Sequence, residues 1–365
     1  MPIVNINLLA KALNAVGVDF DKTVSNLKRD EELVFFNTTA SLNEETMEWH
    51  IPVHGWVYEP QSSWTIRKLI GELLDRKYGL KVDNKTKPIF KRRLSLFTVD
   101  NERSKRIIID LFDQLYELPK SAPNGQFMGL IRIPDHDLKI SIDKTVSFNA
   151  ILRESDQRSF VGSLSFIRPR GVSVVSDIDD TVKLSYINDR KKMFEAAFFQ
   201  PFEAIEGMPE LYQKWAKQGA RFHFVSSSPW QLYAPLNEFM CEFNFPWASF
   251  SLKKVRIKDE TFLNLFKSGL ITKPIAIKEI MQRYPKRKFV LVGDSGEQDA
   301  QAYAQIAREF PKQVKKIYIR NVHADQTLNK QYETIFKGLN RRLWSTFTKP
   351  SQIKMDLSKL ANSDI

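Results

Sequence analysis

The order of apolar and polar residues divides the chain into two parts with different periodicity. Between residues 51 and 167, most stretches alternate as strands do, and turns such as Pro123-Asn124-Gly125 separate them. We expect strands at residues 51–60, 93–99, 106–118, 127–133, 138–142, 146–153 and 160–167. One helix, beginning after Ser62 or Ser63 and ending at Gly79, interrupts them. Successive antiparallel strands with one inserted helix predict a β-rich, sandwich-like domain.

After residue 168 the pattern changes to strands that alternate with helices. Short apolar runs predict buried strands at residues 172–175, 222–225, 289–292 and 314–319. Helices are expected at residues 190–199, 209–219, 229–243, 273–281 and around 303–306, while residues 245–270 look irregular and partly basic. This alternation predicts an α/β fold with a doubly wound parallel sheet and right-handed crossovers.

The 365 residues are therefore expected to form four segments. Residues 1–50 are predicted to be an N-terminal helical segment, and residues 51–168 a β-rich accessory domain. Residues 169–325 are predicted to be the catalytic domain. Residues 326–365 are predicted to be an amphipathic helix and a tail.

Composition adds a charge preference to this picture. Hydrophobic residues make up 42% of the sequence, which is ample for a buried core, and the net charge is +12. That charge favours anionic partners such as phosphates, nucleic acid or acidic lipid headgroups. Cys241 is the single cysteine, which fits a reducing compartment. No signal peptide is expected, and no apolar run approaches the roughly 20 residues that span a bilayer.

Three carboxylates follow the first strand of the α/β part. The stretch VSVVSDIDDT ends with Asp177, Asp179, Asp180 and Thr181. Carboxyl ends of parallel strands bind ligands, and crowded carboxylates need a cation such as Mg²⁺, which also bridges to phosphate. A similar spacing at residues 19–23 (DFDKT) follows a helix-like stretch and is interpreted as a chance match.

Two further strands end in polar groups, and a lysine opens a helix between them. Ser226 and Ser227 follow one strand and are expected at a helix N-terminus, where they hold phosphate oxygens. Lys273 would offset the charge of the phosphate, and Asp294 ends the other strand. Taken singly, each group is also typical of a turn or a helix cap. Their shared position at strand ends favours one phosphate site.

Each carboxylate then receives a predicted role. Asp177 is the nucleophile that forms an aspartyl-phosphate, and Asp179 is the general acid and base. The Mg²⁺ ligands are predicted to be Asp177, Asp179 and Asp294. Asp299 supports the metal site, and Thr181 braces the turn. Asp180 is counted among the supporting residues without a physical role.

The motif set resembles that of the haloacid dehalogenase (HAD) superfamily of phosphatases. DIDDT, FVSSSPWQLY, KPIAIKEIMQRYPKRKFVLVGDSGEQDAQAY and VKKIYIRNV resemble, more narrowly, the catalytic domain of the actin-patch-associated phosphatidate phosphatases. The resemblance spans residues 171–322. It implies Mg²⁺-dependent hydrolysis of phosphatidate to diacylglycerol, with Asp177, Asp179, Ser226, Lys273, Asp294 and Asp299 in the roles above. Lys183 departs from the apolar or small residue that the family tends to carry there.

Short connections around the motifs predict an open site without a large cap. Phe198, Phe199, Trp230 and Trp247 are candidates for an apolar rim, with Arg256 and Lys258 meeting phosphate; core packing is an equal explanation for the aromatic residues. Residues 328–347 combine helical apolar spacing with basic residues, so a membrane-surface helix is one prediction and a helix packed on the domain the other.

Three functions stay open at this point. The favoured one is a Mg²⁺-dependent phosphatidate phosphatase that is cytoplasmic and peripherally membrane-associated, with an anionic phospholipid substrate and no nucleic acid among its partners. The second is a HAD phosphatase for a soluble, protein or nucleic-acid phosphomonoester. The third is a catalytically silent lipid-binding module, against which the complete acid set argues.

Overall fold

The computed structural model describes residues 23–60, 64–138, 144–254, 272–322 and 328–361. The chain divides into two compact units. The β unit consists of residues 1–62 and 99–167, and the α/β unit consists of residues 63–98 and 168–365. Among the helices of the described residues, none is both long and apolar enough to cross a membrane. Residues 19–22 of the second DxDxT match lie outside the described residues.

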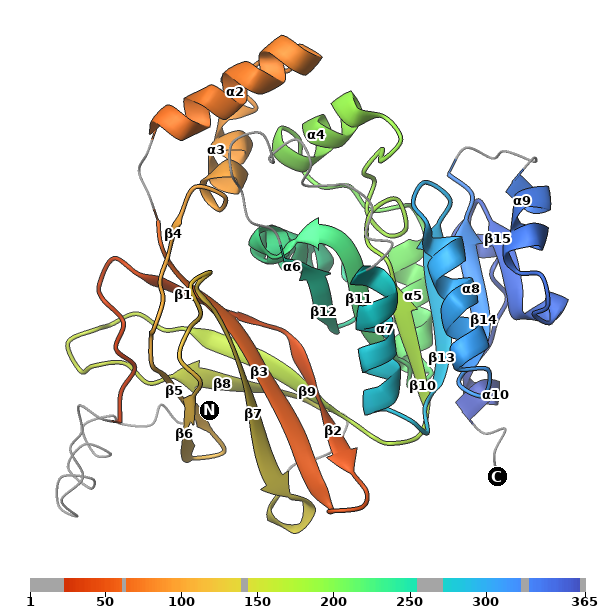
Figure 1. The fold of residues 1–365 in the computed structure, drawn as a ribbon, viewed down its shortest axis with the longest axis horizontal. Helices are drawn as coiled ribbons and strands as arrows, with labels where there is room; N and C mark the ends of the chain where they lie inside the picture. The colour runs from red at the N-terminus through yellow and green to blue at the C-terminus, as the bar shows by residue number, and fades with distance from the viewer. Residues whose placement is uncertain (1–22, 61–63, 139–143, 255–271, 323–327, 362–365) are drawn as a thin grey trace. The chain divides into compact units, whose positions relative to one another are not determined.

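The β unit contains one connected nine-stranded sheet (Figure 1). Its strands are β1 (Glu32–Phe36), β2 (Thr38–Asn43), β3 (Glu48–Glu59), β4 (Asp100–Asn101), β5 (Ile107–Leu111), β6 (Gln114–Leu118), β7 (Gln126–Pro134), β8 (Thr145–Ala150) and β9 (Val161–Ile167). The long strand β3 pairs with β1 and β2, and also with β7. Burial alternates along β7, and the inward side chains join one core with Trp49, Phe148 and Phe166.

Two predictions for the β unit are corrected, and part of a third lies outside the described residues. Residues 32–50 form β1, β2 and the start of β3, so the described part of the N-terminal segment is extended. Its aromatic and β-branched residues favour strands. Residues 106–118 form a hairpin, because Phe112 and Asp113 adopt φ angles of 59° and 60° and reverse the chain. Residues 139–143 lie outside the described residues. The sandwich arrangement stays a prediction.

The α/β unit is built on six parallel strands in the order β12-β11-β10-β13-β14-β15. They are β10 (Val172–Ser176), β11 (Arg221–Pro229), β12 (Ala248–Lys253), β13 (Lys288–Asp294), β14 (Val314–Arg320) and β15 (Trp344–Phe347). Every residue of β10 and β13 is buried, as their apolar sequences require. The chain runs outward from β10 to β12 and returns to β13 on the other side of β10. β10 and β13 therefore border the switch point at which such sheets bind ligands.

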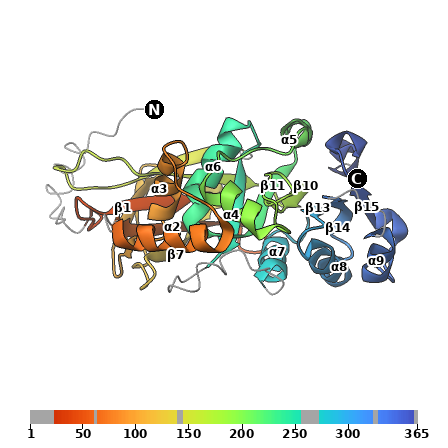
Figure 2. The ribbon, with the colours of Figure 1, turned by 90° about the horizontal axis from the view of Figure 1, so that it is seen from above.

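Helices cover both faces of this sheet, so the predicted α/β fold with a parallel sheet is confirmed. They are α4 (Arg190–Phe198), α5 (Met208–Lys217), α6 (Tyr233–Glu242), α7 (Thr272–Arg283), α8 (Asp299–Glu309), α9 (Leu328–Ile335) and α10 (Leu357–Ala361). Figure 2 shows α5 on one side of the sheet and α7 and α8 on the other. One strand was missed, since β12 lies in the segment predicted to be irregular.

Two helices early in the chain also belong to the α/β unit. They are α2 (Trp64–Tyr78), which ends before Gly79 at a φ of 66°, and α3 (Lys87–Ser95). The strand predicted at residues 93–99 is wrong, because Pro88 starts a helix that buries Phe90, Arg93 and Leu94 at helical spacing. The inserted helix therefore groups with the α/β unit, and the accessory domain does not run without interruption from residue 51 to residue 168.

The long amphipathic helix predicted for the C-terminal segment is also corrected. Helix α9 is short, Gly338 follows at a φ of 84°, and β15 pairs with β14 as the edge strand of the sheet. Tyr332, Phe336 and Trp344 are buried, and the last two rings stack 4.9 Å apart. These aromatic residues pack inside the α/β unit, so this segment does not offer the apolar helix face predicted for a membrane.

Candidate active site

The predicted site residues converge at the carboxyl ends of β10, β11 and β13. Asp177 follows β10, Asp294 ends β13, and Ser226 lies near the end of β11. Lys273 is the second residue of α7, and Asp299 is the first of α8. All five are at least 95% buried. The structure therefore brings together the groups that the sequence placed at separate strand ends.

Asp177 lies at the centre of this group and is fully buried. Its Oδ1 atom is 3.0 Å from Nζ of Lys273, and the hydroxyl of Thr181 donates to its Oδ2 atom at 3.4 Å. Burial raises the pKa of Asp177 well above its ordinary value, Lys273 opposes this, and the neighbouring carboxylates add to it. The ionised form of Asp177 therefore needs more positive charge than Lys273 supplies.

Three carboxylates form ion pairs with the ammonium group of Lys273, and a fourth lies beside them. We call them the carboxylate cluster: Asp177, Asp294, Glu297 and Asp299. Lys273 also forms ion pairs with Asp299 and, at 2.8 Å, with Glu297. Burial opposes the charge on Lys273, but three neighbouring carboxylates raise its pKa well above its ordinary value. Burial and mutual repulsion likewise raise the pKa of Asp294 well above its ordinary value and raise that of Glu297.

Backbone groups fix the position of Asp294. Its Oδ1 atom accepts hydrogen bonds from the N–H groups of Gly296, at 2.5 Å, and Glu297, at 3.1 Å. Its own N–H donates to Oδ2 of Asp299 at 3.1 Å. A Cβ atom at Gly293 would clash with the Asp299 carboxylate, so glycine is needed for this close approach. The Gly-Asp pair thus lets the start of α8 dock on the end of β13.

The carboxylate cluster fits a hard divalent cation. Asp177, Asp294 and Asp299 each offer an oxygen, and these oxygens lie within 4.8 Å of one another. Oδ2 of Asp294 is buried and accepts no hydrogen bond, and Oδ1 of Asp177 is buried with only the ammonium group of Lys273 beside it as an ion pair. Because buried anionic oxygens with few or no donors are costly, an ion coordinated by oxygen suits them. The carboxylate of Asp179, predicted as a third ligand, is not part of this group.

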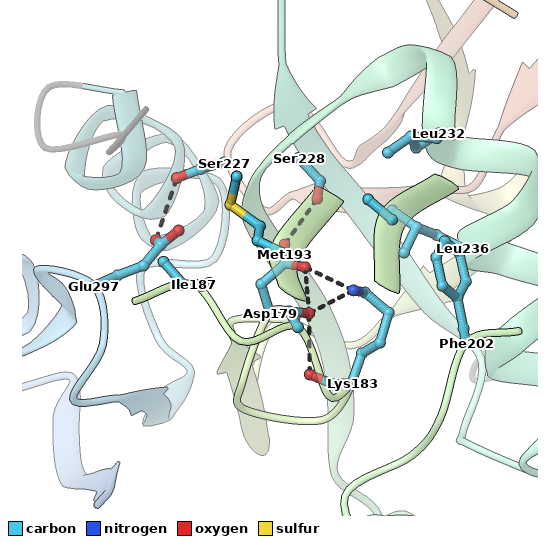
Figure 3. A pocket seen from close by; sticks show the side chains of 12 residues that line it. Asp179, Lys183, Ile187, Met193, Phe202, Ser227, Ser228, Leu232, Leu236 and Glu297 are labelled. Carbon is cyan, nitrogen blue, oxygen red and sulfur yellow. Dashed lines mark hydrogen bonds and ion pairs between the residues drawn. The ribbon is translucent and has the colours of Figure 1, made fainter. Parts of the chain in front are cut away.

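Asp179 instead lies in a pocket of hydrogen-bond donors (Figure 3). Nζ of Lys183 is 2.9 Å from its Oδ1 atom, and the Ser185 hydroxyl donates to the same atom at 2.8 Å. The hydroxyls of Ser226 and Ser228 donate to Oδ2 at 2.9 and 2.7 Å. These five residues form the Asp179 pocket. Burial opposes ionisation, but Lys183 and the donated hydrogen bonds lower the pKa of Asp179 to about 2.

Lys183 was identified from the sequence as a departure from the family pattern, but its contact with Asp179 was not predicted. Its side chain is only 4% exposed, and Nζ also contacts Ser185 and lies 4.8 Å from the ring centre of Phe202. A charged group four residues after Asp179, in a segment without regular structure, gave no periodic signal of this contact. Ser185, in the same segment, was missed for the same reason, whereas Ser228 lies in β11 next to the predicted Ser226 and Ser227 and was missed as a partner of Asp179. Glu297 gave one weak signal, as an acid within the GDSGEQD motif.

Asp180 has a physical role that the sequence did not reveal. Its carboxylate accepts hydrogen bonds from the N–H groups of Ser185, Tyr186 and Ile187 at 2.8, 3.0 and 2.8 Å. Its backbone has a φ of 53°, and its carbonyl oxygen accepts a bond from Nη1 of Arg320 at 2.6 Å. Asp180 therefore shapes the loop that carries Lys183 and Ser185 back to Asp179.

The serines are placed by a strand rather than by a helix N-terminus, which corrects the prediction. β11 continues to Pro229, and a short 3₁₀ turn (Trp230–Leu232) separates it from α6. The side chains of Ser226 and Ser228 reach Asp179, whereas the hydroxyl of Ser227 donates to Glu297 at 3.2 Å. The serines therefore connect the Asp179 pocket to the carboxylate cluster through adjacent residues of one strand.

The aromatic rim predicted around the site is wrong for three of its four members. Phe198, Phe199 and Trp230 are at most 6% exposed and belong to the core, whereas Trp247 is partly exposed. Arg256 and Lys258 lie outside the described residues. Beside Asp179 there is an apolar chamber instead (Figure 3). It is lined by Ile187, Met193, Ala197, Phe202, Leu232 and Leu236, and its free volume of about 10 Å³ holds about one water molecule.

The fold and the site together define an α/β protein with a buried acidic centre at the switch point of its sheet. Residues 172–321 match the family model described as the catalytic domain of phosphatidate phosphatase APP1. The family resemblance inferred from the motifs is thereby confirmed for this part of the chain.

Two curated relatives also match part of this chain. Phosphatidate phosphatase APP1 of Saccharomyces cerevisiae is 36% identical over 160 residues, which cover 43% of this chain and 27% of that protein. An uncharacterized protein of Schizosaccharomyces pombe is 32% identical over 187 residues, which cover 49% of this chain and 31% of that protein. This chain thus spans less than a third of the length of either relative. Apo phosphoserine phosphatase covers 47% of this chain at 12% identity, with a TM-score of 0.29.

Proposed function

We propose that this protein is a Mg²⁺-dependent phosphatidate phosphatase that works through an aspartyl-phosphate on Asp177. The observation that carries the proposal is the carboxylate cluster, in which a buried oxygen of Asp177 forms an ion pair with Lys273 and an oxygen of Asp177 lies close to Asp294. A carboxylate in this setting suits nucleophilic attack on an anionic phosphate, because positive charge is held at the point of attack.

In the first half of the proposed reaction, a carboxylate oxygen of Asp177 attacks phosphorus. A bond from oxygen to phosphorus forms, and the bond from phosphorus to the glycerol oxygen breaks. The departing oxygen takes up a proton as diacylglycerol leaves. Lys273 stays charged throughout, since the carboxylates around it raise its pKa well above its ordinary value, and it offsets the charge of the phosphoryl group.

In the second half, water attacks the aspartyl-phosphate. Asp179 accepts the proton of this water, a new bond from oxygen to phosphorus forms, and the bond to Asp177 breaks to release inorganic phosphate. With Lys183 and the serine hydroxyls in place, a pKa of about 2 keeps Asp179 ionised but makes it a weak base, so release of Lys183 would raise its pKa towards the range of a general base. Its role as the acid of the first half requires Asp179 to leave Lys183 and take up a proton.

The residues that would hold Mg²⁺ are Asp177 and Asp294, supported by Asp299. The fit rests on the buried Oδ2 of Asp294, which accepts no hydrogen bond, and on the buried Oδ1 of Asp177, which has only Lys273 beside it as an ion pair. When bound, the ion would act as a Lewis acid that shields the nucleophile from the phosphate charge. Asp299 contributes by holding both Lys273 and the backbone of Asp294 in place.

The substrate assignment rests on the family resemblance, because the phosphoryl-transfer groups treat phosphomonoesters alike. The match to the phosphatidate phosphatase catalytic domain favours a phosphate presented on diacylglycerol. We therefore place the protein in the cytoplasm, in peripheral contact with a membrane that contains the anionic lipid. A soluble phosphomonoester is the second candidate, since the structured site has little room beside Asp179 for an acyl chain.

Phosphate release from phosphatidate in detergent micelles and from a nucleoside monophosphate tests the proposal. Wild type with Mg²⁺ should act on phosphatidate at least tenfold faster than on the nucleotide, and Asp177→Asn should act on neither. Preference for the nucleotide would support the soluble-substrate alternative. Absence of phosphate release from both would leave the enzyme proposal untenable.

A further inference from the structure

The first two helices of the α/β unit carry most of the net charge of the chain. The basic hairpin consists of residues 64–96, which form α2, α3 and their connection. It contains ten lysines and arginines and three acidic residues, giving a net charge of +7 out of +12 for the chain. A concentration of charge in so short a segment is not needed to fold a helical hairpin, because like charges on neighbouring turns repel each other.

Much of this charge is exposed to solvent. Lys77, Lys81, Lys85, Lys87 and Lys91 are all exposed, and no described carboxylate lies within ion-pair distance of them.

Two apolar side chains on the basic hairpin are exposed as well. Leu69 is 59% exposed and Val82 is 39% exposed. A groove of about 510 Å³ is lined by five basic residues, three acidic residues and the apolar Val82 and Phe90; the charged residues are Arg67, Lys68, Lys81, Lys87, Lys91, Glu72, Asp75 and Asp83. Exposed lysines next to exposed aliphatic groups are typical of surfaces that bind anionic membranes.

The basic hairpin is firmly attached to the helix that covers the candidate site. The buried guanidinium of Arg93 donates to the carbonyl oxygens of Ala196, Ala197 and Gln200 at 3.2, 2.9 and 2.7 Å, at the C-terminal end of α4. Rings also meet across this contact, with centroid distances of 5.4 Å for Tyr78 with Phe194, 4.9 Å for Phe90 with Phe199 and 5.6 Å for Phe97 with Phe198.

Helix α4 carries this attachment to the active site. Met193 and Ala197 of α4 line the apolar chamber beside Asp179. Figure 1 shows α2 and α3 next to α4, beyond the ends of the strands that carry the site. A surface bound by the basic hairpin would therefore lie on the same side of the α/β unit as the site.

We propose that the basic hairpin is the surface by which this protein docks on an anionic membrane. Charge complementarity selects the occupant, and lysines, as point charges on flexible stems, suit the diffuse charge of a lipid surface. The exposed Leu69 and Val82 favour a lipid surface over the phosphate backbone of a nucleic acid, which offers aliphatic groups no apolar layer. This inference rests on the proposed function in that the membrane also holds the substrate.

Co-sedimentation with anionic vesicles tests the proposal without the substrate lipid. The vesicles consist of phosphatidylcholine with about 30 mol% phosphatidylglycerol, whose negative surface charge attracts basic segments. The variant Lys81→Glu/Lys85→Glu/Lys91→Glu should bind at least tenfold more weakly than wild type. The matched control Lys330→Glu/Lys337→Glu/Arg342→Glu reverses the same number of exposed charges on the C-terminal segment. It should bind within threefold of wild type. The proposal would be overturned if the first variant bound vesicles as tightly as wild type, or if the control variant lost as much binding as the first variant.

Two further measurements separate docking from catalysis and from misfolding. Thermal unfolding midpoints of both variants should stay within a few degrees of wild type, since exposed residues are changed. Leu69→Ser provides a second test without a charge change and should weaken vesicle binding at least twofold. Hydrolysis of phosphatidate in detergent micelles reports the proposed function alone. Loss of vesicle binding with retained micelle activity supports docking, whereas a protein that binds vesicles but releases no phosphate refutes only the proposed function.

Discussion

Asp177 and Asp179 lie two residues apart and are both buried, but their surroundings shift their pKa values in opposite directions. In the carboxylate cluster, three acids form ion pairs with one lysine, a fourth acid, Asp294, lies beside them, and the pKa of Asp177 is raised. In the Asp179 pocket, one acid receives a lysine and three hydroxyls, and its pKa falls to about 2. The difference indicates that the carboxylate cluster lacks positive charge and that the Asp179 pocket is complete without a ligand.

The largest effect is expected from removing the nucleophile. Asp177→Asn should lower phosphate release at least 10³-fold, because no carboxylate remains to form the covalent intermediate. The same change should raise the thermal unfolding midpoint by a few degrees, because it removes a buried charge whose pKa is raised. Scanning calorimetry at pH 7 measures this, with the exposed Asp137→Asn as the matched control. A lower midpoint than wild type would contradict the account of the carboxylate cluster.

The second effect concerns the missing positive charge. Chelation of divalent ions should lower activity at least a hundredfold, and added Mg²⁺ should restore it. Mg²⁺ at about 100 times its dissociation constant should also stabilise the folded protein by about 2.7 kcal/mol. Asp294→Asn should abolish most of this stabilisation, whereas Asp179→Asn should keep it, because the Asp179 carboxylate lies outside the metal group. Equal loss in both variants would restore Asp179 as a metal ligand.

The third effect tests whether Lys183 and the three hydroxyls stabilise the ionised Asp179 without a bound ligand. Lys183→Met leaves a buried carboxylate without its cation and should destabilise the protein by about 2 kcal/mol. This is less than the 3–5 kcal/mol typical of a broken buried pair, because three hydroxyls still donate to Asp179. Chemical denaturation measures the loss. The double variant with Asp179→Asn should lose less than the sum of the single losses, and strict additivity would show that the pair is not coupled.

The smallest effect is a difference in pH dependence between the two acids. An acid with a raised pKa stabilises the folded state less as the pH rises from its unfolded value near 3.8 through its folded value. An acid whose pKa is lowered to about 2 contributes stability above pH 3.8, which is lost only as the pH falls towards 2.

This difference gives a measurable outcome between pH 7 and pH 5. The stability gained by Asp177→Asn should shrink as the pH falls, whereas the stability lost by Asp179→Asn should stay constant. Denaturation curves at pH 5, 6 and 7 for both variants test this. If the change in unfolding free energy varied with pH in the same way for both variants, the opposite pKa shifts of the two acids would be contradicted.

The sequence predicted the α/β sheet because its strands are continuous apolar runs that end in polar groups. Val172–Ser176 and Lys288–Asp294 are examples in which every residue is buried. The β unit was harder, because its hairpin at Phe112 and Asp113 lacks glycine. In the α/β unit, part of α3 was predicted to be a strand. The C-terminal error has a similar cause, since Tyr332, Phe336 and Trp344 fit helical spacing although only the first lies in a helix.

Within the site, the sequence identified the residues but not their partners. Motif spacing placed Asp177 and Asp294 at neighbouring strand ends, because parallel strands end at one edge, and placed Lys273 at the start of a helix. It could not predict that Lys183 turns back onto Asp179, because this depends on three backbone hydrogen bonds to the Asp180 carboxylate. The contrast between the two acids comes from such irregular loop contacts, which periodicity does not report.

The most direct test of the central claim is a rapid-quench single turnover with phosphatidate labelled at phosphorus, followed by peptide mapping. We predict transient label on the peptide that contains Asp177, more label in Asp179→Asn, because hydrolysis of the intermediate is slowed, and none in Asp177→Asn. Release of labelled phosphate by wild type without label on this peptide, in wild type or in Asp179→Asn, would contradict Asp177 as the nucleophile.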